Sequence, residues 1–206
     1  MASVTTTTPP RRRRREETRQ KLLDSALATF ARHGYERATI DEIVREAGFS
    51  KGAFYVHFES KDDLFWAMLE GRIARQQGVF LETLDSSISV AANLQAVLTR
   101  VFAFTREDPL WSTLFLEFVA HAARNERVRE RLAAMYESWR SFAVQIVKQG
   151  QEAGIVRKEI EPDFVASVLI AILEGSIVQA RLAGDTARLE GMIEPLSRLL
   201  AGWIEA

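Results

Sequence analysis

The chain has 206 residues, of which 47% are hydrophobic and 27% charged, as in globular proteins with one large or two small domains. It contains no cysteine, which excludes disulfide bonds and thiolate metal sites. The net charge is −1, but residues 1–61 carry 12 basic and 8 acidic side chains, whereas residues 62–206 carry 15 and 20. A basic end on an acidic body favours a polyanionic partner at that end.

Residues 1–15 are rich in Thr and Pro and end in five arginines: Arg11, Arg12, Arg13, Arg14 and Arg15. They lack the apolar stretch of a secretory signal, and the longest apolar run elsewhere, residues 164–173, is far shorter than the roughly 20 residues of a membrane span. We therefore expect a soluble, cytoplasmic chain without a membrane partner. Residues 1–15 are predicted to be a disordered arm, either a solvated tail or an arm that lies on nucleic acid.

Helical periodicity begins at residue 16 and predicts a first helix that ends at Gly34. A capping box of Thr39 and Glu42 begins a second helix, which Gly48 ends after about eight residues. A third, short helix follows Ser50 and reaches about residue 58, and a long fourth helix covers about 60–84. Helix, glycine-containing turn and helix is the pattern of the helix-turn-helix motif, and REAGFSKGAF is that turn.

The third helix is predicted to divide into a buried side and a DNA-facing side. At 100° per residue, Phe54 and Phe58 fall together and form the buried side. Small residues occupy the opposite face: Gly52, Ala53 and Val56. Such a face allows close approach to a DNA major groove, where Lys51 is expected to reach guanine acceptors. Tyr55 and His57 lie at the flanks and are expected to donate to phosphates.

Lys61 lies in the first turn of the fourth helix, where the helix dipole disfavours a cation. Together with the helix N-terminus it predicts a phosphate site; the alternative is an exposed lysine that tolerates a weak mismatch. Thr39 is explained by capping alone, and a phosphate contact from its hydroxyl or backbone amide is compatible with that role.

The segment TIDEIVREAGFSKGAFYVHFESKDDLF, together with Phe30, Gly34 and Tyr35, resembles the DNA-binding domain of the TetR family of bacterial transcriptional repressors. The resemblance covers residues 16–66 and implies a helical homodimer with a variable C-terminal ligand domain. It also implies that Lys51 and Gly52 meet base edges, and that Thr39, Tyr55, His57 and Lys61 hold phosphates. The run of arginines exceeds the common family pattern. The candidate DNA-binding residues are Thr39, Ser50, Lys51, Gly52, Ala53, Tyr55, Val56, His57, Lys61 and Arg11–Arg15.

The remaining chain is helical in pattern and contains no predicted strand. Helices are expected around 94–102, over 110–123, over 126–153, over 162–182 and around 189–203, so that the all-α fold has about nine helices. The predicted organisation is an arginine-rich arm (1–15), a helix-turn-helix domain (16–62) and a ligand-binding and dimerisation domain (63–206).

Aromatic residues are dense between residues 102 and 142. They either fill a packed core or line an apolar pocket between helices, with a histidine as a polar partner. On the second interpretation the effector is small and mainly hydrophobic or aromatic. The candidate pocket residues are Phe104, Trp111, Phe115, Phe118, His121, Tyr136, Trp139 and Phe142.

The last two helices are apolar on more than one side, which a single chain does not need. The second apolar face predicts a homodimer with a four-helix interface. The candidate interface residues are Val165, Leu169, Ile172, Leu196, Leu200 and Trp203.

Signatures of catalysis are missing from the sequence. It has no HExxH, no Gly-rich phosphate loop followed by a strand and no Glu-x-x-His, so we expect no enzyme, no metal and no cofactor. The sequence predicts a ligand-responsive transcriptional repressor that binds a palindromic operator as a homodimer. The alternatives are an activator, or a helical interaction protein without ligand control.

Overall fold

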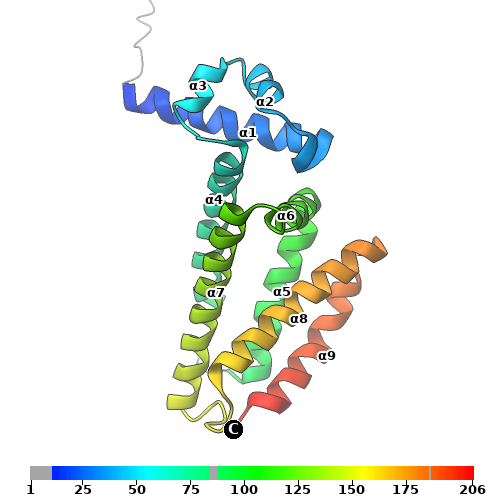
Figure 1. Ribbon diagram of the computed structural model, residues 1–206. Helices are drawn as coiled ribbons and strands as arrows, with labels where there is room; N and C mark the ends of the chain where they lie inside the picture. Colours follow the sequence, from blue (N-terminus) through cyan, green and yellow to red (C-terminus); the bar gives the residue numbers. More distant parts are fainter. Residues whose placement is uncertain (1–10, 84–87, 186) are drawn as a thin grey trace, which may run out of the picture. The chain divides into compact units, whose positions relative to one another are not determined.

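The computed structural model describes residues 11–83, 88–185 and 187–206. Figure 1 shows helices joined by short connections, and the described residues contain no strand beyond one isolated bridge between Val156 and Glu205. In this described part the helices are α1 (Arg11–Arg37), α2 (Ile40–Ala47), α3 (Lys51–Tyr55), α4 (Lys61–Thr83), α5 (Val90–Glu107), α6 (Pro109–Ala122), α7 (Glu126–Glu152), α8 (Pro162–Ala183) and α9 (Ala187–Ile204). The predicted all-α class and helix number are confirmed.

The first helix begins earlier than predicted. Residues 11–15 belong to α1, so this part of the expected disordered arm is helical; residues 1–10 lie outside the described residues. Arginine is a good helix former, and Arg13 pairs with Glu17 one turn later at 3.0 Å. At the other end, Gly34 has φ 73° and ψ 169°, so the regular helix is interrupted at the glycine where the sequence predicted its end.

Capping side chains fix the turn between α2 and α3. The backbone amide of Thr39 donates to Glu42 Oε2 at 3.0 Å, and the amide of Glu42 donates to Thr39 Oγ1 at 3.3 Å, which is the predicted capping box. Gly48 ends α2 in the left-handed conformation with φ 72°. Ser50 Oγ then accepts from the amide of Ala53 at 3.2 Å and starts α3.

The chain divides into two compact units, residues up to Ile73 and residues from Ala74 onward. The division falls later than the predicted boundary at residue 62 because the first half of α4 belongs to the core of the first unit. The ring of Phe65 lies 5.9 Å from that of Phe30 and 5.2 Å from that of Tyr35, and all three side chains are buried. This aromatic cluster joins α4 to α1.

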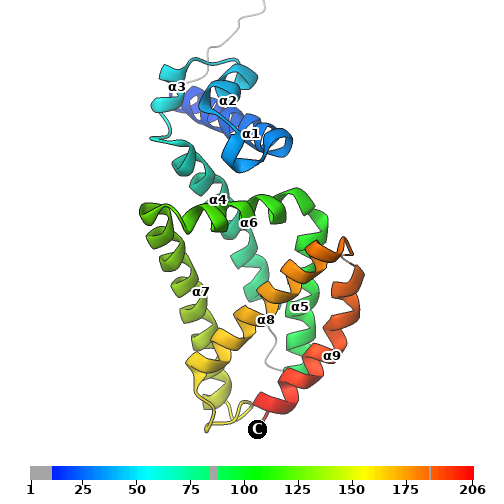
Figure 2. The ribbon, with the colours of Figure 1, turned by 45° about the vertical axis from the view of Figure 1, so that its right-hand side comes forward.

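The second unit is a bundle in which α5 packs along α9 and α7 packs along α8 (Figure 2). Its core has two centres, one around Val165 and Ile204 and the other around Phe102 and Leu189. Of the described helices, only α8 has the length and composition of a membrane span, with a mean hydropathy of 1.6 over its most apolar 18 residues. Because only 22% of that stretch is buried within the chain, α8 leaves much apolar surface uncovered.

Candidate nucleic-acid interface

The short helix α3 presents one side to solvent and buries the other. Phe54 is 0% and Phe58 3% exposed, and their rings lie 5.6 Å apart. Tyr55 and Val56 are 56% and 61% exposed. The predicted division of this segment into a buried and an open side is therefore confirmed, although α3 ends at Tyr55 rather than near residue 58. Because the buried Phe54 anchors α3, the exposed side chains of Tyr55 and Val56 are held on a fixed backbone and are accessible to a partner.

Small size at Gly52 is not required by packing. A Cβ added there meets Ser50 Oγ at 3.6 Å, which is ordinary van der Waals contact, and the backbone of Gly52 is helical. The residue is exposed at the start of α3. A glycine that the fold does not need, on an exposed helix face, permits a partner to approach the backbone closely.

The ammonium group of Lys51 has a partner that the sequence analysis missed. Its Nζ lies 2.8 Å from Asp41 Oδ1 on α2, and this hydrogen bond and the charge of Asp41 raise the pKa of Lys51. Both side chains are more than half exposed, so the pair is readily exchanged for another one. Because an ammonium group has three donors and Asp41 takes one, Lys51 keeps donors for a further acceptor.

The structure gives Lys61 a role inside the protein. Its Nζ donates hydrogen bonds to three backbone carbonyls at the end of α1, those of Tyr35 (2.7 Å), Glu36 (3.1 Å) and Ala38 (3.0 Å). It also lies 4.6 Å from the centre of the Tyr35 ring. An ammonium group has three donors, and all three are used here. Lys61 therefore joins the carbonyls that follow the interruption at Gly34 to the start of α4, and the phosphate contact that the sequence analysis assigned to it stays a prediction.

The next residue of α4 completes this connection, because the hydroxyl of Tyr35 donates to the carboxylate of Asp62. Burial raises the pKa of the Tyr35 hydroxyl strongly, and the hydrogen bond and charge of Asp62 raise it further. We call Tyr35, Lys61 and Asp62 the α1–α4 clamp. The clamp holds the start of α4 against the end of α1, within the unit that carries the helix-turn-helix.

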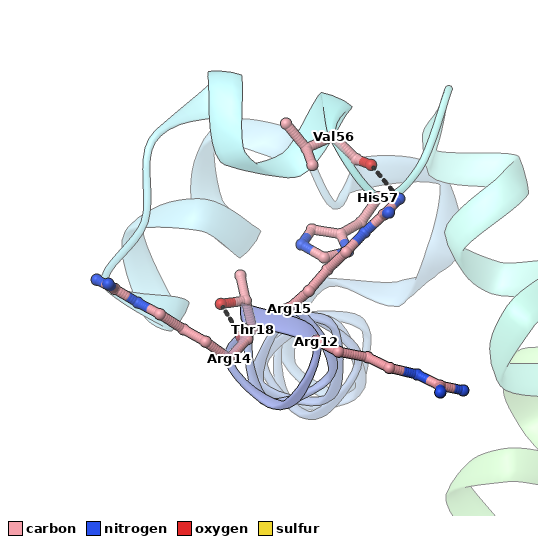
Figure 3. Close-up of a pocket in the computed structure, with 6 residues that line it drawn as sticks. All are labelled: Arg12, Arg14, Arg15, Thr18, Val56 and His57. Carbon is pink, nitrogen blue, oxygen red and sulfur yellow. Dashed lines mark hydrogen bonds between the residues drawn. The ribbon is translucent and has the colours of Figure 1, made fainter. Parts of the chain in front are cut away.

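Three arginines of α1 and the end of α3 line a concavity of about 620 Å³, and Figure 3 shows that Arg15 extends toward Val56 and His57, whereas Arg12 and Arg14 extend to opposite sides of α1. Arg15 reaches across to α3, where its Nη2 donates to the carbonyl of Val56 at 3.5 Å. Burial lowers the pKa of the His57 imidazole, and the charges of Arg15 and Arg19 lower it further. The concavity thus combines permanent positive charge with a neutral imidazole near pH 7. Its lining residues are Arg12, Arg14, Arg15, Thr18, Val56 and His57.

The other predicted DNA-binding residues are placed as follows. The hydroxyl of Thr39 is bonded within the capping box, where it also donates to Glu42 Oε2 at 2.8 Å. Arg13 pairs with Glu17 and does not line the concavity, and the side chain of Arg11 lies outside the described part. No group of His, Asp and Glu in the described residues is arranged to hold a metal ion.

The predicted aromatic pocket coincides with neither of the two concavities described among the placed side chains, and it stays a prediction. Trp111 is 8% and Phe118 0% exposed, so both belong to the packed core, while Phe142 is 38% exposed. The ring of Tyr136 lies 5.2 Å from that of Trp139, and both are partly buried. Neither the basic concavity nor a second one of about 490 Å³ on α5 is lined by these residues, Phe115 and His121 included. The side chain of Phe104 is outside the described part.

Two of the six predicted dimer residues, Val165 and Leu200, need a correction, and the assignment of the other four stays a prediction. Val165 and Leu200 are 0% and 2% exposed within one chain, because they fill the core between the helices rather than its outer face. Leu169 and Trp203 also pack against that core. The exposed apolar residues of α8 and α9 are instead Phe164 (59%), Leu182 (84%) and Leu199 (67%).

Each of the two units matches a known family model. Residues 22–68 match the family model of bacterial regulatory proteins of the tetR family. Residues 90–205, more than half of the chain, match the model of the C-terminal part of BetI-type transcriptional repressors.

Similar proteins extend along nearly the whole chain. The transcriptional repressor DhaR of Mycobacterium sp. (strain GP1) is 27% identical over 190 residues, 91% of each protein. A TetR transcriptional regulator from Chloroflexus aurantiacus superposes with a TM-score of 0.77 at 26% identity over 94% of this chain and 98% of that one. The regulator FadR of Bacillus subtilis, solved in complex with stearoyl-CoA, shares the fold with a TM-score of 0.74 at 14% identity over 86% and 96% of the two chains. The chain belongs to the TetR family of DNA-binding transcriptional regulators.

Proposed function

We propose that this protein is a homodimeric repressor that binds a palindromic operator and is released from it by a small, mainly hydrophobic or aromatic effector. The observation that carries the DNA-binding part is the geometry of α3. Its phenylalanines are buried while Tyr55 and Val56 are more than half exposed, beside an exposed Gly52 and Lys51. This is the surface of a recognition helix that enters the major groove and reads bases with small side chains.

Phosphate contacts are proposed at the basic concavity rather than at Lys61. Arg15 brings a permanent charge to the end of α3, where His57 also lies, and Arg12 and Arg14 line the same concavity from α1. Phosphate contacts of this kind set where a recognition helix lies and carry little base preference. They are expected to act together with Tyr55, on the exposed side of α3. Lys51 exchanges Asp41 for a base acceptor when DNA binds.

The proposed dimer contact uses the outer faces of α8 and α9. Phe164 and Leu182 are 18 residues apart on α8, which places them on one line of the helix after five turns. Gly175 lies on that side, and an added Cβ there meets nothing within 4 Å, as is also the case at Gly191 and Gly202 of α9. Exposed apolar side chains interspersed with glycines suit close helix–helix packing against a second copy.

Effector control is proposed to work by population shift. The dimer exchanges between spacings of its two α3 helices that match the operator and spacings that do not. A ligand that binds the second state more tightly draws the protein off DNA. Once Trp111 and Phe118 are assigned to the core, the partly buried Tyr136 and Trp139 of α7 are two of the candidate aromatic side chains that remain to contact such a ligand.

The test is fluorescence anisotropy of the full-length protein on the DNA upstream of its own gene. Tyr55→Ala and Val56→Ala are each expected to lower operator affinity about tenfold, because Tyr55 is a proposed phosphate contact and Val56 lies on the proposed reading face. Arg124→Ala, an exposed arginine of the second unit, is the control and leaves affinity unchanged. Unchanged affinity in both α3 variants contradicts the assignment of α3.

Repressor, activator and interaction protein give different results in two further measurements. A reporter driven by the same upstream region rises on deletion of the gene for a repressor and falls for an activator. Sedimentation is expected to show a dimer that Leu182→Asp and Leu199→Asp dissociate. A protein without ligand control gives no compound that both raises its melting temperature and lowers its affinity for DNA.

A further inference from the structure

The C-terminal end of α3 contacts two arginines of α1 that lie one turn apart. Arg15 Nη2 donates to the carbonyl of Val56 at 3.5 Å, and Figure 3 shows this contact. The guanidinium carbon of Arg19 lies 5.5 Å from the centre of the Phe58 ring, within the range of a cation–π contact. Arg19 is partly buried and Phe58 is 3% exposed. Residues four positions apart share one side of a helix, so this side of α1 faces the end of α3.

The helix α3 is too short to be stable on its own. It has five residues, whereas an isolated helix needs about 12–15 to be even marginally stable in water. Ser50 caps its start, and the chain's own amides satisfy the carbonyls of Gly52 and Phe54. The carbonyl of Val56 lies beyond them and accepts from Arg15 instead. The place of α3 is therefore set by its neighbours, and at its C-terminal end α1 is one of them.

Arg19 differs from the arginines that are proposed to contact phosphates. It does not line the concavity that Arg12, Arg14 and Arg15 line. Its guanidinium group lies over the ring of a buried phenylalanine, and its Nη1 is 3.9 Å from Glu16 Oε1, at the limit of an ion pair. The cation of Arg19 therefore has its closest described partners within the protein.

We propose that Arg19 is a positioning residue for operator binding, which through Phe58 holds the C-terminal end of α3 where the recognition helix meets DNA. The two residues before Phe58 are Val56, on the proposed reading face, and His57, a proposed phosphate contact. A displacement of Phe58 moves both of them. The inference deepens the proposed DNA binding by α3 and rests on it. It adds a residue that the sequence analysis did not place in the DNA-binding set.

The experiment measures operator affinity of the full-length protein by fluorescence anisotropy. Arg19→Met keeps an apolar stem over Phe58 and removes the cation, and it is expected to lower affinity about threefold to tenfold, the range of one cation–π contact. Arg19→Lys keeps a cation beside the ring and is expected to retain most of the affinity. The control is Lys21→Met, which removes an exposed cation from the opposite side of α1 and leaves affinity unchanged.

The salt dependence of affinity distinguishes positioning from a direct phosphate contact. Loss of one phosphate contact reduces the slope of log affinity against log salt by about 0.9. Because Arg19 acts through Phe58, Arg19→Met is expected to keep the wild-type slope while its affinity falls. Urea denaturation of the same variant establishes that it is folded under the conditions of the affinity measurement.

The titration of His57 tests the place of Arg19 without DNA. Burial lowers the pKa of the His57 imidazole, the charges of Arg15 and Arg19 lower it further, and the charge of Glu16 raises it. Because the Arg19 cation disfavours the imidazolium, Arg19→Met is expected to raise this pKa toward 6.5, and Arg19→Lys is expected to leave it near the wild-type value. The measurement is an NMR titration in which His57→Gln assigns the signal.

Four results overturn the inference. The first is wild-type operator affinity in Arg19→Met, and the second is a salt slope reduced by about 0.9, which makes Arg19 a phosphate contact. The third is a lower stability in urea with unchanged affinity of the folded protein, which leaves Arg19 a structural role only. The fourth is a pKa of His57 that does not change in Arg19→Met.

The proposed DNA binding by α3 fails on different evidence. If Tyr55→Ala and Val56→Ala bind the operator like the wild type, α3 is not the reading helix, and the inference about Arg19 falls with it. If those two variants bind weakly and Arg19→Met binds normally, α3 keeps its role and only the inference about Arg19 is wrong.

Discussion

Replacement of Lys61 by methionine distinguishes two roles of this residue, a structural contact in the α1–α4 clamp and a phosphate contact to DNA. The apolar stem of Lys61 is kept, while the three hydrogen bonds to the carbonyls at the end of α1 and the interaction with the Tyr35 ring are lost. The part-buried carbonyls of Tyr35 and Ala38 each lose the Lys61 donor. We therefore expect the variant to have a lower free energy of unfolding and the same number of phosphate contacts to DNA.

The magnitude follows from the contacts. A part-buried carbonyl left without a donor costs about 1–3 kcal/mol, and a cation–π contact contributes about 0.5–2 kcal/mol. Water re-enters this half-exposed site, and burial already lowers the pKa of the Lys61 ammonium group, which shows that its desolvation opposes the gain. Taking the lower end of each range for the two carbonyls and the cation–π contact gives a loss of about 2.5 kcal/mol in the free energy of unfolding.

The assay is urea denaturation followed by circular dichroism, together with the salt dependence of operator affinity. Each phosphate contact contributes about −0.9 to the slope of log affinity against log salt. A clamp predicts lower stability and an unchanged slope, and Lys61→Arg does not restore stability because a planar guanidinium does not reach three converging carbonyls. Lys21→Met, an exposed lysine of α1, is the control. A Lys61→Met variant with wild-type stability and a slope reduced by about 0.9 refutes the clamp.

Three further predictions concern neighbouring groups. Tyr35→Phe removes the hydroxyl that donates to Asp62 and is expected to cost about 1–3 kcal/mol in urea unfolding, with no loss if that contact is absent in solution. The Thr39 hydrogen bonds lower the pKa of Glu42 below its ordinary 4.5. The stability that the ionised Glu42 adds to the folded protein is therefore complete above about pH 4.5 and is lost as the pH falls. Glu42→Gln is expected to flatten the acid side of a curve of stability against pH. The pKa of His57 lies below 6.5 in the free protein and rises beside a phosphate, so operator affinity is expected to increase as the pH falls from about 7.5 to 6, and to do so less in His57→Gln. A pH profile that is the same with and without His57 contradicts its place at a phosphate.

Backbone features were predictable because local chemistry decides them. Gly34 and Gly48 have positive φ, where glycine is favoured, and the Thr39–Glu42 capping box needs only residues three positions apart. The buried side of α3 followed from the spacing of Phe54 and Phe58. The helical arginines were missed because composition alone favours disorder for a basic run, whereas pairing with Glu17 supports a helix.

Partners between distant residues were not predictable in the same way. Lys61 looked misplaced in a first helical turn because only the fold brings the end of α1, some 25 residues earlier, to its ammonium group. Lys51 and Asp41 meet for the same reason. Helix α8 has apolar residues on more than one side, and periodicity alone did not show which side is buried. Val165 was therefore assigned to the outer face, which Phe164 occupies. Each error concerns which of two sides of a helix meets another helix, and this depends on packing rather than on sequence spacing.

The clamp also gives the DNA-binding unit a mechanical consequence. Its three residues join the first turn of α4 to the end of α1, and α1 packs on α2, which supports α3. A displacement of α4 therefore moves the recognition helix as part of one body instead of bending a flexible joint. In the proposed dimer, a rigid connection at this end means that a small rotation of α4 changes the spacing of the two α3 helices, to which binding of the proposed palindromic operator would be sensitive. If Lys61→Met loosens the joint, an effector is expected to release DNA less completely, even at concentrations that saturate its binding site.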